Sequence, residues 1–210
     1  MKIHIVGAGV VGLATGAGFS RFGHDVVYTD QQNNHKLEAD FHFICTPEDV
    51  VRQVVKQMED VGGVIVVRST TAPATIESLE EELGRPILHN PEFLREAYAE
   101  SDFLEAHYVV IGASVRGLSH AKGLGGLYEA MSKEPIYCGL TESEFIKFLH
   151  NDFLATLISF WNEVRPLCAH FGVNSHRIAR MMMQIDPRVP RYGALRHGGP
   201  YGGKCLPKEL

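Results

Sequence analysis

The chain has 210 residues, of which 45% are hydrophobic and 21% are charged, the usual composition of a globular protein. Its formal charge of -5 argues against a surface for nucleic acid or for an anionic membrane. No apolar run reaches the roughly 18 residues that a membrane span needs, and the first residues do not have the layout of a signal peptide.

A glycine-rich stretch follows the first expected strand. The sequence predicts a strand over residues 2–6, then Gly7-Ala8-Gly9-Val10-Val11-Gly12, then a helix over residues 13–22. This is G-x-G-x-x-G between a strand and a helix, which is the context that dinucleotide binding requires. The first glycine permits the tight turn, the second lets a pyrophosphate approach the backbone, and the third lets the helix pack closely on the sheet. The N–H groups at the start of the helix then face the phosphates.

An acidic residue follows the second expected strand, residues 25–29. Asp30 comes 18 residues after Gly12, where a carboxylate can bind the adenosine ribose hydroxyls and repel a 2′-phosphate. The sequence therefore favours NAD over NADP. The alternative is a Rossmann-like domain that has lost its ligand.

The remaining residues up to 140 alternate between strands and helices. Strands are expected over residues 41–45, 63–67, 86–89, 108–111 and 135–138, and helices over residues 48–60, 73–83 and 117–131. The polar residues 31–40 leave room only for a loop or a single helical turn. The alternation predicts an α/β fold with a Rossmann-like, doubly wound parallel sheet.

Polar residues follow three of these strands. Cys45-Thr46-Pro47, Ser69-Thr70 and Asn90-Pro91-Glu92 each come where a strand ends. Because ligands of open α/β sheets bind outside the carboxyl ends of the strands, these residues are candidates to line the binding crevice.

The pattern changes at Thr141. Residues 141–171 predict one long helix, with Thr141 as N-cap and Glu144 completing a capping box. Pro166 predicts a kink or break near residues 162–165. A second helix is expected over residues 174–183, followed by an irregular stretch over residues 186–201. We therefore expect two domains, residues 1–140 and a small, partial helical domain over residues 141–210.

Two groups of side chains suggest chemistry. Lys147 and Asn151 are one helical turn apart and could bind an oxyanion together, although a solvated lysine beside a surface asparagine is the ordinary alternative. Cys205 lies in Gly202-Gly203-Lys204-Cys205-Leu206-Pro207-Lys208-Glu209, where neighbouring lysines would favour a nucleophilic thiolate. The alternative interpretation is that Cys205 is an ordinary thiol in a glycine-rich tail.

The other cysteines and the histidines do not predict a cross-linked or metal-bound protein. Cys45, Cys138, Cys168 and Cys205 are widely spaced, without a C-x-x-C pair. The eleven histidines have no metal-ligand spacing, so we expect no metal site. A reducing, cytoplasmic compartment is the default expectation.

Seven ordered stretches resemble the UDP-glucose/GDP-mannose dehydrogenase family. They are GAGVVG with Asp30, FICTP, RSTTAPAT, NPEFLREA, ESEFIKFLHNDFLA with WNEV, DPRV, and YGGKCLPKE, and they cover nearly the whole chain. NPEFLRE and GGxCxPK are the most specific of these motifs. The resemblance implies an NAD-dependent, four-electron oxidation of a primary alcohol of a nucleotide sugar to a carboxylate, in the context of polysaccharide biosynthesis. It also implies a homodimer formed through the 141–171 helix.

The resemblance also assigns expected roles to individual residues. Those implied in catalysis are Cys205 as the nucleophile, Lys147 and Asn151 for the oxyanion, and Glu92, Thr70 and Glu209 for protons and water. Those implied in NAD binding are Gly7, Gly9, Val10, Val11, Gly12, Asp30, Cys45, Thr46, Pro47, Ser69, Thr70, Glu96 and Lys208. Those implied in substrate binding are Glu92, Phe93, Leu94, Glu96, Lys147, Asn151, Arg188, Tyr201 and Gly202, with Arg188 reaching across a dimer interface.

The sequence departs from the family pattern in four places. Glu209 stands where the family has aspartate, Pro200 where it usually has glycine, and the link over residues 31–40 is short. The family's third domain, which clamps the nucleotide, is not matched within these residues, so we expect weak activity of this chain alone. The alternatives are a non-catalytic NAD-binding or dimerising module and, less consistent with Cys205, a two-electron hydroxyacid dehydrogenase.

Overall fold

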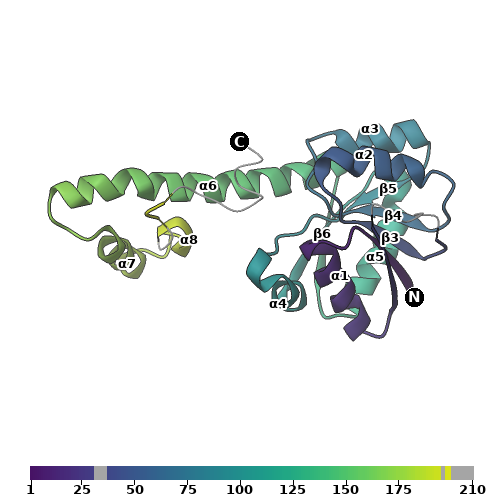
Figure 1. Ribbon diagram of the computed structural model, residues 1–210, viewed down its shortest axis with the longest axis horizontal. Helices are drawn as coiled ribbons and strands as arrows, with labels where there is room; N and C mark the ends of the chain where they lie inside the picture. Colours follow the sequence, from purple (N-terminus) through teal and green to yellow (C-terminus); the bar gives the residue numbers. More distant parts are fainter. Residues whose placement is uncertain (31–36, 195–196, 200–210) are drawn as a thin grey trace. The chain divides into compact units, whose positions relative to one another are not determined.

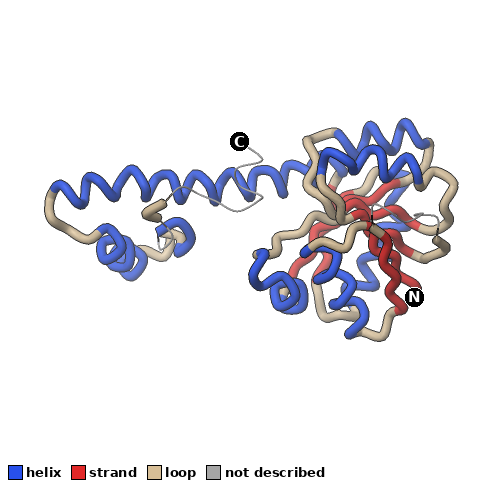
Figure 2. The backbone as a smooth tube through the Cα atoms, viewed as in Figure 1, coloured by secondary structure: helices blue, strands red, loops and turns tan. Residues whose placement is uncertain are grey.

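The computed structural model describes residues 1–30, 37–194 and 197–199. The chain divides into two compact units, Met1–Lys147 and Phe148–Leu210, and each is described here by itself. The first unit contains the sheet and the helices that cover it, and the second is helical (Figures 1 and 2). The division falls inside a long helix rather than at its start.

Seven strands of the first unit form one sheet in the order β2-β1-β3-β4-β5-β6-β7. The strands are β1 (Lys2–Val6), β2 (Asp25–Thr29), β3 (Phe41–Ile44), β4 (Val64–Val67), β5 (Ile87–His89), β6 (Tyr108–Gly112) and β7 (Glu134–Cys138). Neighbouring strands are parallel except β5 and β6, which are antiparallel and pair at His89 and Gly112. The predicted doubly wound sheet is therefore confirmed, and its strands are parallel except for this one pair.

The antiparallel step arises from the connection between β5 and β6. This connection contains a short 3₁₀ helix, η1 (Glu96–Tyr98), and α4 (Ala99–Glu105), neither of which was expected from the sequence. The α4 sequence, AESDFLE, is short and polar, and only Ala99 and Phe103 are buried. A helix of two turns with so few apolar positions gives no detectable periodicity.

Helices cover both faces of the sheet (Figure 1). The remaining helices of this unit are α1 (Val10–Arg21), α2 (Glu48–Gln57), α3 (Thr75–Leu83), η2 (Val115–Gly117) and α5 (Leu118–Glu129). Successive strand residues point to opposite faces. Ile3 and Ile5 thus join the core beneath α1, α4 and α5, whereas Val6 joins the core beneath α2 and α3. Because both faces are covered, the inner strands are mostly apolar, with His4, His42 and His89 as buried polar exceptions.

The long helix α6 runs without interruption from Leu140 to His170. The expected break near residues 162–165 is wrong, since Pro166 lies inside the helix. A proline here removes one backbone hydrogen bond and crowds the preceding turn. Contacts of the preceding turn hold the helix in the second unit, because Trp161 and Val164 pack in its core and Arg165 donates to the Gly198 carbonyl.

The capping box expected at the start of α6 is also wrong. Thr141 lies within the helix and donates a hydrogen bond to Glu77 (3.1 Å). Glu142 accepts from the Gly139 N–H (2.7 Å). The Glu144 carboxylate, fully buried, binds the start of α3 instead of its own helix.

The second unit has a small core of its own. The α7 helix (Ser175–Ile185) begins after Asn174, whose side chain accepts from the Arg177 N–H and caps the helix. A short turn, α8 (Arg191–Ala194), has non-helical angles at Tyr192 and Gly193, so the described residues 186–194 are irregular as expected. Of the rest of the stretch expected to be irregular, residues 195–196 and 200–201 lie outside the described residues. Trp161, Ala179 and Ala194 form the buried centre.

Two negative findings apply to the described residues. No helix there is long and apolar enough to cross a membrane. No group of three histidine, cysteine or acidic side chains in that part of the chain could hold a metal ion.

Candidate functional site

The glycine-rich turn between β1 and α1 has the geometry of an anion site. Gly7 has φ +99°, and a Cβ there would lie 2.7 Å from the Cys45 carbonyl oxygen. A Cβ on Gly12 would lie 1.9 Å from the Gly7 carbonyl oxygen, so both positions require glycine. At Gly9, by contrast, a Cβ would meet no atom within 4 Å. The missing side chain of Gly9 therefore leaves open space for a ligand.

The start of α1 lies at this turn. Gly9 is the N-cap, no side chain caps the helix, and the first turn contains no acidic residue. The N–H groups of such a first turn lack partners within their own helix and carry the positive end of the helix dipole. Val10 and Val11, at the first two helical positions, thus present backbone donors suited to a phosphate.

The polar residues after β3 and β4 lie beside this turn. The Ser69 hydroxyl donates to the Thr46 carbonyl oxygen (2.6 Å), which ties the two strand ends together. The buried Thr46 hydroxyl has no hydrogen-bond partner among the described residues, and its methyl group lies 3.2 Å from a Cβ built on Gly7. A buried hydroxyl without a partner is costly unless a ligand satisfies it. The donors and space here fit the phosphates of a dinucleotide.

Asp30 directly follows β2, and its side chain is exposed. Its main-chain neighbour Thr29 accepts a hydrogen bond from the Gly7 N–H (2.8 Å). The end of β2 is thereby joined to the glycine-rich turn, which places Asp30 at the same edge of the sheet. This is where the ribose of a bound dinucleotide lies in such folds.

A buried ion pair follows β5. The Lys147 ammonium group donates to the Glu92 carbonyl oxygen (2.6 Å) and to its carboxylate (3.1 Å), and both side chains are over nine-tenths buried. The ammonium also lies 5.4 Å from the centre of the Phe93 ring. Since removing one partner of a buried pair leaves an uncompensated charge, each residue needs the other. The pair places a proton acceptor and a cationic donor at one point.

The Glu92 carboxylate is also close to the dinucleotide edge. Burial raises the pKa of the Cys45 thiol to about 12, Arg68 opposes this shift, and the Glu92 charge adds to it. Cys45 is therefore a poor nucleophile at neutral pH. The glycine-rich turn lies against the backbone of Cys45, since a Cβ on Gly7 would be 2.7 Å from the Cys45 carbonyl oxygen. Glu92 follows β5, which is parallel to β4, β3 and β1, so the acid and the expected cofactor turn lie at the same carboxyl edge of the sheet.

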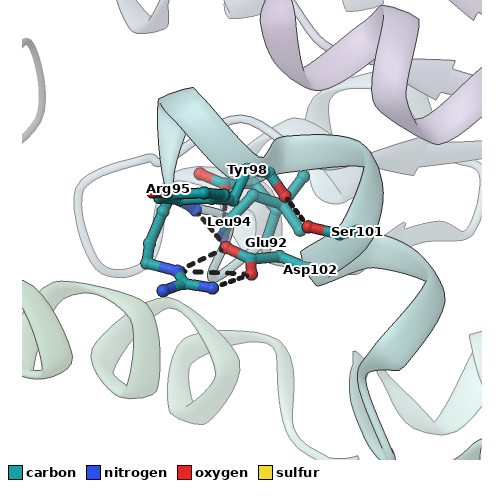
Figure 3. Close-up of polar contacts among 6 residues, drawn as sticks. All are labelled: Glu92, Leu94, Arg95, Tyr98, Ser101 and Asp102. Atoms are coloured by element: carbon teal, nitrogen blue, oxygen red, sulfur yellow. Dashed lines mark hydrogen bonds and ion pairs between the residues drawn. The ribbon is translucent and has the colours of Figure 1, made fainter.

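The loop that carries Glu92 is fixed at its far end by α4, as Figure 3 shows. Glu92 turns back to accept the Leu94 N–H (2.6 Å). Asp102 accepts both the main-chain N–H of Arg95 (2.8 Å) and its guanidinium group. The Arg95 guanidinium also lies 4.7 Å from the centre of the Tyr98 ring. Glu96, at the start of η1, is held on this exposed segment.

Residues that the sequence did not indicate hold the near end of this loop. The buried Arg68 guanidinium donates to the Asn90 side-chain oxygen (2.5 Å) and to the Tyr128 hydroxyl (3.0 Å). Tyr128 also donates to that oxygen (2.5 Å), and the Asn90 amide donates to the Val110 carbonyl (2.7 Å). Asn90 is therefore locked just before Glu92. Tyr128 stands in none of the motifs, and Arg68, the first residue of RSTTAPAT, carries no sequence signal for this contact, so only the structure reveals the role of either residue.

Glu144 holds the loop after β4. Its carboxylate accepts from the Thr71 hydroxyl (2.8 Å), the Ala74 N–H (2.8 Å) and the Ile76 N–H (3.1 Å). It thus supplies the N-terminal cap of α3, which has no cap from its own N-cap residue. Thr70, half-buried, lies immediately before this clamp. One end of α6 therefore contacts both candidate loops, through Glu144 and through Lys147.

The remaining predicted site residues belong to the second unit or lie outside the described residues. Asn151 is buried and lies one turn after Lys147 in α6. Arg188 is exposed, and its guanidinium pairs with Asp186 (2.9 and 2.5 Å). The expectations for Tyr201, Gly202, Cys205, Lys208 and Glu209 lie outside the described residues, as does most of the 31–40 link.

Two models of one protein family match this chain. Residues 31–132 match the NAD binding domain of the UDP-glucose/GDP-mannose dehydrogenase family, and residues 141–210 match its central domain. The chain belongs to this family. The resemblance of the seven sequence motifs is thereby confirmed, and the chain carries the family's NAD-binding domain.

Relatives of the UDP-glucose/GDP-mannose dehydrogenase family align with the whole chain. A putative UDP-glucose 6-dehydrogenase of Bacillus subtilis is 28% identical over 100% of this chain and 62% of its own length. The UDP-glucose 6-dehydrogenase of Rhizobium meliloti is also 28% identical, over 100% of this chain and 62% of its own length. This chain thus spans less than two thirds of the length of these relatives.

Solved structures of the family share the fold. A UDP-glucose dehydrogenase of Pyrobaculum islandicum superposes with a TM-score of 0.85, at 27% identity, over 99% of this chain and 62% of that one. A GDP-mannose dehydrogenase of Pseudomonas aeruginosa, at 24% identity, superposes with a TM-score of 0.78 over 100% of this chain and 62% of that one. Because its identity is only 24%, the likeness to the Pseudomonas aeruginosa structure shows a shared fold alone.

Proposed function

We propose that this chain is the NAD-binding and central part of a nucleotide-sugar 6-dehydrogenase, an enzyme that oxidises a primary alcohol of the sugar to a carboxylate. The observation that carries the proposal is the buried Lys147–Glu92 pair, at the same carboxyl edge of the sheet as the glycine-rich turn. A donor and an acceptor of protons are fixed there at the edge of a dinucleotide fold. Membership of the dehydrogenase family supports the substrate class.

The cofactor of the proposed reaction is NAD. The Gly9 opening, the first-turn N–H groups of α1 and the Thr46 hydroxyl would hold its phosphates, and Asp30 its ribose. Two NAD molecules, bound one after the other, would supply the two hydride acceptors that a four-electron oxidation needs. The residues of this chain bind NAD, exclude water and handle protons.

The first oxidation takes the alcohol to an aldehyde. Glu92 accepts the hydroxyl proton directly or through water. Thr70, which precedes the Glu144-bound Thr71, assists with the proton and the water. The Lys147 ammonium, with Asn151, stabilises the negative charge that develops on the oxygen. Lys147 can do this only while Glu92 keeps it in place, which is why the pair matters.

The second oxidation uses Cys205 in this proposal. Its thiolate adds to the aldehyde carbon, and the resulting oxyanion takes a proton to give a thiohemiacetal. Loss of the second hydride and of that proton gives a thioester. Water, activated by Glu209 or Glu92, then attacks the thioester, which releases the carboxylate product and restores the thiol. A cysteine is needed only for this second oxidation, so it distinguishes the reaction from a two-electron dehydrogenase.

The reactivity of the four thiols tests the proposal. Burial raises the pKa of Cys45 to about 12 and that of Cys138 to about 11, and Cys168 is buried. We expect iodoacetamide near pH 7 to alkylate Cys205 first, as mapped by mass spectrometry. Faster alkylation of Cys45 or Cys138 than of Cys205 would contradict the proposed nucleophile, and the urea-unfolded chain gives the reference rate for each thiol.

We also propose that the chain forms a homodimer through α6. Phe153, Phe160 and Leu167 recur every seven residues and are each more than half exposed. Apolar side chains at this spacing form one stripe on a helix, which a second copy can cover. Sedimentation equilibrium should give twice the mass of 23.3 kDa, and Phe160→Glu should give the monomer. A wild-type monomer at micromolar concentration would contradict the dimer.

A further inference from the structure

The second unit contains a cavity between the second half of α7 and the irregular segment that follows this helix. Its volume of about 620 Å³ lies within the range of small-molecule sites in proteins, about 300–1,000 Å³. Its lining side chains are Arg180, Met183, Gln184, Pro187, Val189 and Arg191. All six belong to the described part of the second unit, and none of them has a role in the proposed reaction.

One side of this cavity is apolar and rests on the core of the unit. Met183 and Val189 pack against the buried cluster of Trp161, Ala179 and Ala194, and both are only partly buried themselves. The cavity therefore offers apolar surface that the fold leaves uncovered. A ligand that covers this surface removes it from water, which favours binding.

The polar side chains that line the cavity have no partners of their own. Among the described residues, Arg180, Gln184 and Arg191 form no hydrogen bond through their side chains and no ion pair. Arg188, which lies outside the lining, is by contrast neutralised by Asp186, with 2.9 Å between the guanidinium and the carboxylate. Two cationic groups and one amide are thus available to a ligand.

Positive charge is concentrated around this cavity. Residues 174–194 contain four arginines and one aspartate, whereas the whole chain has a formal charge of -5. The carbonyl end of α7 lies at Ile185 and opposes an anion with roughly half an elementary charge. The two guanidinium groups carry two full charges and outweigh this effect. The electrostatic balance in the cavity therefore favours an anion.

We propose that this cavity binds an organic diphosphate of the nucleoside diphosphate class. A guanidinium group binds two oxygens of one phosphate at once. Arg180 and Arg191 come from different elements, α7 and α8, so each takes one of two neighbouring phosphate groups. The organic part covers the apolar side, where the Gln184 amide supplies a donor and an acceptor. The inference stands on the cavity and does not depend on the proposed reaction.

Calorimetric titration of the 210-residue chain with ADP and with inorganic pyrophosphate tests the proposal. NAD is present at saturation, so that the glycine-rich turn is occupied. We expect ADP to bind at least about threefold more tightly than pyrophosphate, because its base covers apolar surface. Arg180→Gln and Arg191→Gln should each weaken both ligands by about tenfold or more. Gln184→Ala should weaken ADP and leave pyrophosphate unchanged.

Matched controls are available on the same helix. Arg177→Gln removes the same charge one turn earlier in α7, from a side chain that does not line the cavity, and should weaken ADP less than about twofold. Arg180→Lys keeps the charge but not the planar fork, so it should fall between the unaltered chain and Arg180→Gln. Circular dichroism checks that each variant keeps its helices.

Three results would overturn the proposal. The first is the lack of saturable ADP binding in the presence of NAD. The second is an equal loss in Arg177→Gln and Arg180→Gln, which would show attraction to a positive surface rather than a site. The third is pyrophosphate binding as tight as that of ADP, which would leave the apolar side without a ligand. A loss confined to the variants of Arg180, Gln184 and Arg191 supports the site.

Discussion

At the scale of single residues, we propose that Asp30 governs the choice between NAD and NADP. It is exposed after β2, and the neighbouring Thr29 carbonyl binds the glycine-rich turn. A carboxylate here can accept hydrogen bonds from ribose hydroxyls but repels a phosphate in their place. This choice could be predicted from the sequence, because both the spacing from Gly12 and the residue type are local properties.

Asp30→Ala should narrow the preference for NAD over NADP by about tenfold, or about 1.4 kcal/mol of binding free energy. Titration calorimetry with both dinucleotides measures it. Asp25→Ala removes the same charge from the other end of β2 and should leave the ratio unchanged. Equal or tighter binding of NADP by the unaltered chain would contradict the assignment.

His89 makes the stability of the fold depend on pH. Burial lowers its pKa to about 3, with the Arg68 and Lys147 charges acting in the same direction. In the unfolded chain a histidine has a pKa near 6.5. Between about pH 6.5 and pH 3 this histidine therefore binds a proton in the unfolded chain but not in the folded chain. The contribution of His89 to the free energy of unfolding is therefore fully present above about pH 6.5. It falls on acidification below that pH, by about 1.4 kcal/mol per pH unit.

Urea unfolding between pH 7.5 and 5 tests this dependence. His89→Asn retains a donor toward the Ser143 hydroxyl, which His89 contacts at 2.7 Å. The variant should lose part of the pH dependence, whereas His120→Asn, at an exposed position in α5, should keep it. An identical slope in His89→Asn and the unaltered chain would show that this histidine does not cause the dependence.

At the scale of elements, the sequence predicted most helices and strands, including both ends of β1 and β2, but not the contacts between elements. Local periodicity and the glycine signals identify α2, β4 and the glycine-rich turn. The sequence does not reveal that Glu144 caps α3, because the same S/T-x-x-E pattern serves equally well for a cap in its own helix. Pro166 is tolerated for a similar reason, since tertiary contacts outweigh the local preference for a break. The buried Lys147–Glu92 pair joins residues 55 positions apart, so only the fold brings it together.

Glu144→Ala tests the cap that α6 supplies to α3. The change leaves the Thr71 hydroxyl and the Ala74 and Ile76 N–H groups without their acceptor in a buried place. We expect a loss of about 2 kcal/mol or more in the free energy of unfolding, with faster hydrogen exchange at the first amides of α3. Glu142→Ala, which removes an exposed acceptor of one N–H, should cost clearly less. Equal costs for the two variants would contradict the special role of Glu144.

At the scale of the whole molecule, the chain holds the family's NAD-binding and central domains and spans 62% of the relatives' length. Binding energy from remote parts of a substrate positions its reacting carbon, so an assay of residues 1–210 alone is expected to give a low kcat as well as a high KM. We propose that Glu209, one methylene longer than the aspartate of the family pattern, also lowers kcat. We therefore expect the 210-residue chain to bind NAD but to turn over far below the roughly 1–1,000 per second of ordinary enzymes.

The number of NADH molecules formed per sugar oxidised tests the proposed reaction most directly. The chain is incubated at substrate-like concentration with NAD and UDP-glucose or GDP-mannose, and NADH is measured by absorbance and the sugar product by mass spectrometry. We predict two NADH for each uronic acid formed, and none of the acid in Cys205→Ser. One NADH per sugar, with the aldehyde as the end product, would contradict the four-electron reaction, and bound NAD without any NADH would identify a non-catalytic module instead.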